Sequence, residues 1–290
     1  MSKNNILISD KYKKGLGISR FFCYLVLILL TLMCLFPFII LIINATRLNS
    51  EIQKGFTLLV GNSFFRNANN LFSDPNIPIF RALLNSVFIS TSASFLAIYV
   101  SSMTAFGIYM YNFKLKKFAF SFIMMVMMVP VQVSALGFLK LMARWNLMDT
   151  FFPLIVPAAA APAVVFFMIQ YMQSVLPFEV VEAARVDGSN EFYTFNKIVV
   201  PILKPALALQ AIFSFVSNWN NYFIPALVIN SKNKKTIPIL IAQLRSADYM
   251  KFDLGKVYML ICVAILPLLL VYLFLSRFII QGVTLGSVKG

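Results

Sequence analysis

The chain has 290 residues, of which 60% are hydrophobic and 12% are charged, and its mean hydropathy is +0.83. With so large an apolar fraction, the polar residues are too few to cover an apolar core with a water-facing surface. The composition therefore excludes an ordinary soluble domain and predicts an integral membrane protein. The formal charge of +15 comes from 25 Lys and Arg scattered in small groups, which argues against nucleic-acid binding and favours contact with anionic lipid headgroups.

Residue types that serve catalysis and metal binding are scarce. The sequence contains no histidine, which removes histidine acid–base chemistry and histidine metal ligands. Its three cysteines, Cys23, Cys34 and Cys262, lie inside apolar runs without the CxxC spacing of a metal or redox site. We therefore expect buried, unpaired thiols, no metal site and no catalytic residue in this chain.

Six segments are long and apolar enough to cross a bilayer as helices. The first follows "KYKKGLGISR" and has no small-residue cleavage site after it, which predicts an uncleaved span behind a cytoplasmic tail at 1–20. The remainder, 21–290, is expected to form one all-α domain with six transmembrane helices. The six predicted spans are 21–44, 82–110, 118–139, 151–172, 204–229 and 257–280.

The distribution of basic residues leaves the orientation of these spans open. With the N-terminus inside, the inner segments hold 13 basic residues and the outer ones 12. The tail at 1–20 and the short "KLKK" turn at 114–117 favour an inner location for both. Six basic residues in the connection at 231–256 argue the other way.

Ionisable residues are kept out of the predicted spans. All ten acidic residues fall outside the apolar cores, whereas ion-coupled transporters usually hold a carboxylate within the bilayer. The chain also lacks G-x-x-x-x-G-K-[ST], the phosphate-binding loop of many ATPases. Uphill transport would therefore need energy from a partner. A secondary transporter or facilitator of a neutral polar solute, working alone, is the alternative.

The connection at 173–203, between the fourth and fifth spans, holds four of the ten acidic residues. Small apolar residues around Glu182 predict a short helix, Gly188 fits a left-handed C-terminal cap, and Ser189 suits the N-cap of a second helix. Two readings stay open for this helix–turn–helix. It could dock into a groove of a partner, or pack on its own bundle with Glu182 and Arg185 as an i, i+3 pair.

The fifth span, which contains "QAIFSFVSNWNNYF", is unusually rich in amides and hydroxyls. Such groups are costly in hydrocarbon unless they face a cavity or another helix, and several recur at helical spacing. Amides beside a tryptophan suit a sugar, although hydrogen bonding between helices explains them as well. The candidate substrate-pathway residues are Gln210, Ser214, Ser217, Asn218, Trp219 and Asn221.

"EAARVDG", followed by nine residues and "IVVP", resembles the E-A-A-x-x-x-G-x9-I-x-L-P loop of ABC importer permeases. Val200 stands where that loop has leucine. "RALLNSVFIS", "WNNYFIPALVI" and the ending "FIIQGVTLGSVKG" are similar to the carbohydrate-importer, maltose-type branch. The residues that match the loop are Glu182, Ala183, Ala184, Gly188, Ile198 and Pro201.

The resemblance implies that the loop is a cytoplasmic coupling helix seated in a groove of an ATPase subunit. Both termini would then be cytoplasmic in a multi-pass protein of the cell membrane. ATP and Mg²⁺ would bind two partner ATPases, and this chain would hold no cofactor. A second permease and an extracytoplasmic solute-binding protein would complete the importer, whose sugar the sequence does not specify. The residues implied in ATPase coupling are Glu182, Ala183, Ala184, Asp187, Gly188 and Pro201.

Overall fold

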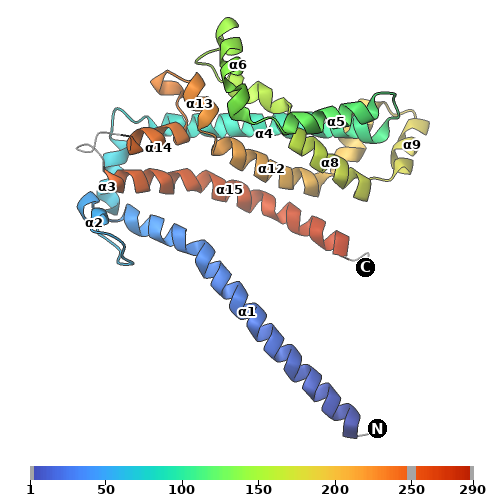
Figure 1. Ribbon diagram of the computed structural model, residues 1–290, viewed down its shortest axis with the longest axis horizontal. Coiled ribbons are helices and arrows are strands. Elements are labelled where there is room, and N and C mark those ends of the chain that lie inside the picture. Colours follow the sequence, from blue (N-terminus) through green and yellow to red (C-terminus); the bar gives the residue numbers. More distant parts are fainter. Residues whose placement is uncertain (1–2, 247–252, 288–290) are drawn as a thin grey trace. The chain divides into compact units, whose positions relative to one another are not determined.

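The computed structural model describes residues 3–246 and 253–287, with side chains for 20–246 and 253–276. Every regular element in these described ranges is helical (Figure 1), which confirms the all-α fold. Four helices are long and apolar enough to cross a membrane, and two bent helix pairs raise the number to as many as six. The four are Arg20–Ala45, Ile79–Met110, Phe152–Val175 and Leu254–Ser276.

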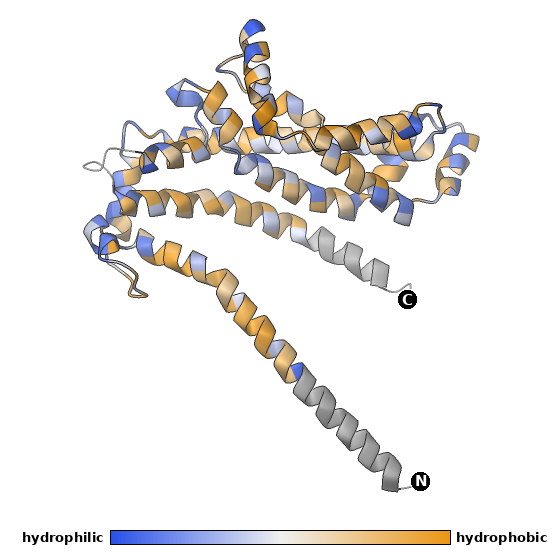
Figure 2. Cartoon of the chain, viewed as in Figure 1, coloured by the Kyte–Doolittle hydropathy of each residue, from blue (hydrophilic) through white to orange (hydrophobic). Residues whose placement is uncertain are grey.

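The chain divides into two compact units, residues 1–73 with 251–263 and residues 74–250 with 264–290. The first unit contains α1 (Lys3–Ala45), α2 (Asn49–Gln53), α3 (Phe64–Phe72) and the first turns of α15 (Leu254–Ser287). The described part of α1 is apolar on all sides (Figure 2) and largely exposed, as expected for a helix that meets lipid or another protein.

Asn67 of α3 organises the end of α1 in the first unit. Its side chain is buried and donates hydrogen bonds to the carbonyls of Ala45 (2.9 Å) and Arg47 (2.8 Å). A Cβ at Gly255 would lie 2.8 Å from the Asn67 amide nitrogen, so glycine permits the close approach of α15. The amide thus satisfies carbonyls that α1 leaves free at its C-terminus.

In the second unit, α4 (Ile79–Met110) packs against α8 (Pro162–Val175) and α12 (Lys204–Trp219). The buried face of α4 carries small residues about one turn apart, which lets neighbouring backbones approach closely. These small buried residues are Ala82, Ser86, Ser90, Ala93, Ala97, Ser101 and Ala105.

Several predicted spans are broken helices rather than single ones. The segment at 118–139 forms α5 (Lys116–Met127) and α6 (Val131–Arg144), which meet at 96°. Pro130 is the N-cap of α6 and has no N–H to continue the hydrogen bonding of α5, which explains the break. Figure 1 shows α6 turning away from α5.

The fourth and fifth predicted spans are interrupted too. The fourth consists of α7 (Phe152–Ile155), the 3₁₀ turn Val156–Ala159 and α8, each with a proline in its first two positions. The fifth ends early, because α12 stops at Trp219 and a separate α13 (Phe223–Val228) follows. The second unit closes with a 3₁₀ turn, Lys232–Lys234, α14 (Ile237–Arg245) and the rest of α15. The ending at 278–290, which contributed to the family resemblance, has no described side chains.

Candidate functional site

The acidic connection folds as a helical hairpin, with α9 (Phe178–Val186) as its first arm. Gly188 follows α9 at φ +78°, as expected for a left-handed cap. Its N–H bonds to the Arg185 carbonyl (3.0 Å), and the N–H of Ser189 reaches back to the Ala184 carbonyl (2.9 Å). This pair of bonds is a Schellman motif, which satisfies the last carbonyls of α9 and reverses the chain sharply.

The second arm begins at Glu191, close to the predicted start, but its N-cap is not the predicted residue. Asn190, not Ser189, is the N-cap of α10 (Glu191–Thr194), because its side-chain oxygen accepts the N–H of Tyr193 at 2.8 Å. Ser189 is already held by the turn, and its hydroxyl pairs with that of the buried Thr194 at 2.8 Å. A π-helical turn (Phe195–Val199) and α11 (Val200–Ile202) complete this arm before an 84° bend into α12.

An ion pair ties the two arms together. Arg185 Nε donates to Glu191 at 2.7 Å, so the i, i+3 pair of Arg185 with Glu182 is not the one that forms. The Arg185 guanidinium also lies 5.2 Å from the centre of the Tyr111 ring, within cation–π range. The hydrogen bond to Glu191 raises the pKa of Arg185 above its ordinary value.

Aromatic residues at the end of α4 anchor the hairpin, and the sequence analysis did not identify them. The Tyr109 hydroxyl donates to the Leu176 carbonyl (3.0 Å), just before α9, and its ring lies 4.8 Å from that of Phe178. Lys116 in turn donates to the carbonyl of Tyr109 at 3.1 Å. The run "YMY", shortly before "KLKK", is the sequence signal that could have identified this anchor.

The two faces of α9 have different environments. Val181 and Ala184 are buried at 0% and 5% exposure and pack on the bundle. Glu182 and Ala183 are exposed, and Val186 is 87% exposed. The other implied coupling residues, Asp187, Gly188 and Pro201, are exposed as well. One face of α9 therefore packs on the helices of its own chain, and the opposite face is accessible to a partner.

Further apolar side chains extend this accessible surface onto α10. Phe192 and Tyr193 are 65% and 55% exposed, although the segment connects helices outside the apolar cores. We call the exposed residues Glu182, Ala183, Val186, Phe192 and Tyr193 the hairpin surface. An apolar surface with an acidic residue beside it, at a loop between spans, is typical of a protein-binding site.

The predicted pathway residues of α12 do not share one environment. Gln210 and Trp219 are buried, Trp219 stacks on Phe215 at 5.7 Å, and Ser217 is exposed. The Asn218 amide nitrogen donates to the Ser214 carbonyl at 2.8 Å. Asn221 lies beyond the end of α12, so the predicted helical face does not extend to it.

Two pockets in the second unit bear on a solute pathway. The larger, about 720 Å³, has an almost wholly apolar lining that includes Phe95, Leu207 and Phe274, and none of the six predicted pathway residues lines it. The smaller offers about 10 Å³, enough for about one water molecule, and Asn218, Trp219 and Asn221 line it. The larger pocket also has the hydroxyls of Ser94 and Ser102 in its lining, but the smaller pocket is the more polar of the two.

Residues 97–284 match the family model "binding-protein-dependent transport system inner membrane component". The chain is 32% identical to the arabinooligosaccharides transport system permease protein of Bacillus subtilis, over 97% of this chain and 99% of that one. It is also 32% identical to the lactose transport system permease protein of Rhizobium radiobacter (92% and 95%). Its identity to the sn-glycerol-3-phosphate transport system permease protein of Yersinia pestis is 28% (93% and 96%).

The fold has a solved counterpart in a bacterial ABC transporter involved in the import of the acidic polysaccharide alginate. The TM-score is 0.74 at 18% identity, over 96% of this chain and 98% of that chain. The family model, the relatives that align from end to end, and this fold confirm the resemblance noted in the sequence. The chain belongs to the binding-protein-dependent transport system inner membrane components, the permease subunits of ABC importers.

Proposed function

We propose that this chain is the transmembrane subunit of an importer that moves a sugar or oligosaccharide into the cell. ATP hydrolysis on partner subunits drives the movement, and the hairpin of α9 and α10 transmits it. The chain itself carries no catalytic residue and no cofactor. The observation that carries the proposal is the hairpin surface, which is apolar and exposed although the same hairpin is fixed to the bundle by Val181, by Tyr109 and by the contact of Arg185 with the Tyr111 ring.

A fixed hairpin with an accessible outer face suits force transmission. A partner that binds Ala183 and Val186 moves the hairpin, and the Tyr109 anchor passes that movement to α4. Rigid-body motion of packed helices is a common way for a binding event to reach a distant site. Glu182, exposed and unpaired among the described side chains, is the polar anchor to the ATPase.

Neutral polar chemistry supports a sugar as the solute. Besides the apolar Ile89, Leu154 and Pro225, the smaller pocket is lined by amide, hydroxyl and indole side chains and by no ionisable one. Uncharged hydrogen-bonding groups beside an aromatic ring suit a polyhydroxylated molecule. The names of the arabinooligosaccharide and lactose permeases agree with this class, whereas the glycerol-3-phosphate permease shows that relatives also serve an anion.

The proposed assembly contains this chain, a second permease, two cytoplasmic ATPase subunits with ATP and Mg²⁺, and an extracytoplasmic solute-binding protein. Both termini and the hairpin lie on the cytoplasmic side of the cell membrane. Two arguments support this orientation. The basic residues of the tail and of the 114–117 turn favour the cytoplasmic side, and ATP is available to the ATPases only on that side. A permease that worked alone would have no use for the hairpin surface.

The test is ATP-dependent sugar uptake by cells or vesicles that carry Glu182→Lys. We expect uptake to be abolished while the amount of chain in the membrane stays unchanged, because the substitution reverses a charge on the docking surface only. Glu179→Lys, the same change one turn earlier on α9, is the matched control and keeps most of the uptake. Normal uptake by Glu182→Lys would refute the coupling role of the hairpin.

A further inference from the structure

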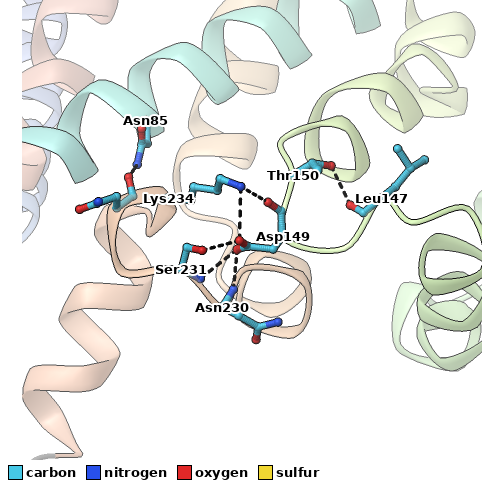
Figure 3. A network of polar contacts seen from close by, with 8 residues as sticks. Asn85, Leu147, Asp149, Thr150, Asn230, Ser231 and Lys234 are labelled. Carbon is cyan, nitrogen blue, oxygen red and sulfur yellow. Dashed lines mark hydrogen bonds and ion pairs between the residues drawn. The ribbon is translucent and has the colours of Figure 1, made fainter.

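A cluster of polar contacts far from the hairpin in sequence holds the connection between α13 and α14 (Figure 3). One oxygen of the Asp149 carboxylate accepts the backbone N–H groups of Asn230 and Ser231, both at 2.9 Å. The other accepts the Ser231 hydroxyl and the Lys234 ammonium, the latter at 3.3 Å. A single side chain thus satisfies four donors of one loop.

The turn that carries Asp149 is built for this role. Its backbone is left-handed at φ 55°, a conformation that aspartate tolerates better than most residues. The Asp149 N–H donates to the Val228 carbonyl at 2.9 Å, so the turn is bonded to the end of α13 as well. Thr150 closes the turn by donating its hydroxyl to the Leu147 carbonyl at 2.7 Å.

A second clamp comes from α4. The Asn85 amide donates to the carbonyls of Asn233 (2.9 Å) and Lys235 (3.0 Å), and the Ser86 hydroxyl accepts the N–H of Ile237 (2.9 Å). The connection from residue 229 to residue 236 is therefore held from both sides, by Asp149 and by α4. We call these contacts the latch.

The latch sets the position of Thr236, which forms one wall of the smaller pocket. Thr236 is 4% exposed, and its hydroxyl oxygen has no hydrogen-bond partner among the described residues. A buried hydroxyl without a partner costs free energy unless another molecule satisfies it. Ser86, Ser90, Asn218 and Asn221 line the same pocket.

We propose that this pocket receives one hydroxyl group of the solute, and that Asp149 is the positioning residue that holds Thr236 in its wall. The pocket's space of about 10 Å³ matches one hydroxyl oxygen, and its lining offers donors and acceptors without charge. Asp149 touches no solute and acts through the loop that it fixes. This inference rests on the proposed import of a sugar, and it adds Thr236, Ser86 and Asp149 to the residues that serve it.

The experiment measures how many ATP molecules are hydrolysed per sugar imported, in vesicles that hold the complete importer. The sugar is whichever of lactose and arabinooligosaccharides the wild-type complex imports. Thr236→Val removes the unpaired hydroxyl without changing the side-chain shape, and Asp149→Asn keeps a side chain that suits a left-handed backbone while it removes the charge. Lys232→Gln is the control, since Lys232 donates to the Pro75 carbonyl and not to Asp149.

We expect Thr236→Val and Asp149→Asn to raise the ATP-to-sugar ratio at least threefold and Lys232→Gln to leave it unchanged. A purely structural defect would lower ATP hydrolysis and uptake together and leave the ratio as in the wild type. That result in both variants would overturn the proposal, and an altered ratio in Thr236→Val alone would overturn the role of Asp149. Failure of the import hypothesis itself has a different signature, because the wild-type complex would then show no ATP-dependent uptake.

Discussion

Gly188 is the residue on which the shape of the hairpin depends most directly. At φ +78° an L side chain is strained by about 1–2 kcal/mol, although a Cβ there would meet no atom within 4 Å. We therefore expect Gly188→Ala to loosen the Schellman turn and to reduce ATP-dependent uptake several-fold. Gly188→Asn, which tolerates the same backbone, should restore most of the activity. Equal uptake by the alanine variant and the wild type would show that the turn geometry is not needed.

Asp149 gives a prediction for pH. Hydrogen bonds from Ser231 hold its pKa well below the usual 3.8. A carboxyl whose pKa is lowered in the folded state stabilises the protein above the unfolded pKa, and this stabilisation is lost as the pH falls towards the folded value. The stability difference between wild type and Asp149→Asn, about 1.5–3 kcal/mol for hydrogen bonds to a charged group, should stay constant from pH 5 to 8. Thermal unfolding of the purified proteins checks this, and a difference that changes within that range would contradict the assignment.

Single residues were predictable where a motif fixed them and unpredictable where two neighbours competed. Gly188 stood out because few residues accept a left-handed cap. Ser189 and Asn190 are both good N-cap residues, and the sequence could not rank them. The turn decides between them, since the N–H and the hydroxyl of Ser189 are already bonded to Ala184 and Thr194.

At the scale of the element, the two arms of the hairpin should be energetically coupled through Arg185 and Glu191. Their side chains are 34% and 44% exposed, so the ion pair is worth less than about 1 kcal/mol after solvent screening. We expect Arg185→Gln and Glu191→Gln each to destabilise the protein, and the double variant to cost less than the sum of the two. A thermal-unfolding double-mutant cycle measures the coupling, and strictly additive effects would exclude it.

Helix positions followed from the apolar runs, but helix breaks did not. The run at 118–139 looked continuous because Met and Val fill it, and Pro130 alone marks where α5 ends. The central role of α4 was missed for a related reason. Its packing face is made of Ala and Ser, which a search for large apolar residues does not detect.

For the whole molecule, the proposed function assigns ATP hydrolysis to other subunits, which can be tested directly. The chain has no phosphate-binding loop, so the purified chain alone should hydrolyse no ATP above background. Addition of the proposed partners, two ATPase subunits and a second permease, should be required for turnover. Steady-state phosphate release measures this. Robust ATP hydrolysis by the chain alone would contradict the proposal that separate subunits hydrolyse ATP.

The orientation was the global property that the sequence alone left open, and the structure shows one reason. Basic residues in the α13–α14 connection weakened the charge asymmetry, yet Lys232 and Lys234 donate hydrogen bonds to the chain itself, at Pro75 and Asp149. Lysines that take part in contacts within the protein are poor indicators of the cytoplasmic side. Long-range contacts of this kind, 85 residues apart for Lys234 and Asp149, cannot be seen in the sequence.

Cross-linking from two adjacent alanines tests the central claim, that the hairpin surface binds an ATPase subunit. Ala183 is exposed and Ala184 is 5% exposed, so the pair differs in access and not in chemistry. With Cys23, Cys34 and Cys262 replaced by serine, Ala183→Cys should cross-link to an ATPase subunit in the assembled complex, whereas Ala184→Cys should not. No cross-link from position 183, or equal cross-linking from both positions, would contradict the account.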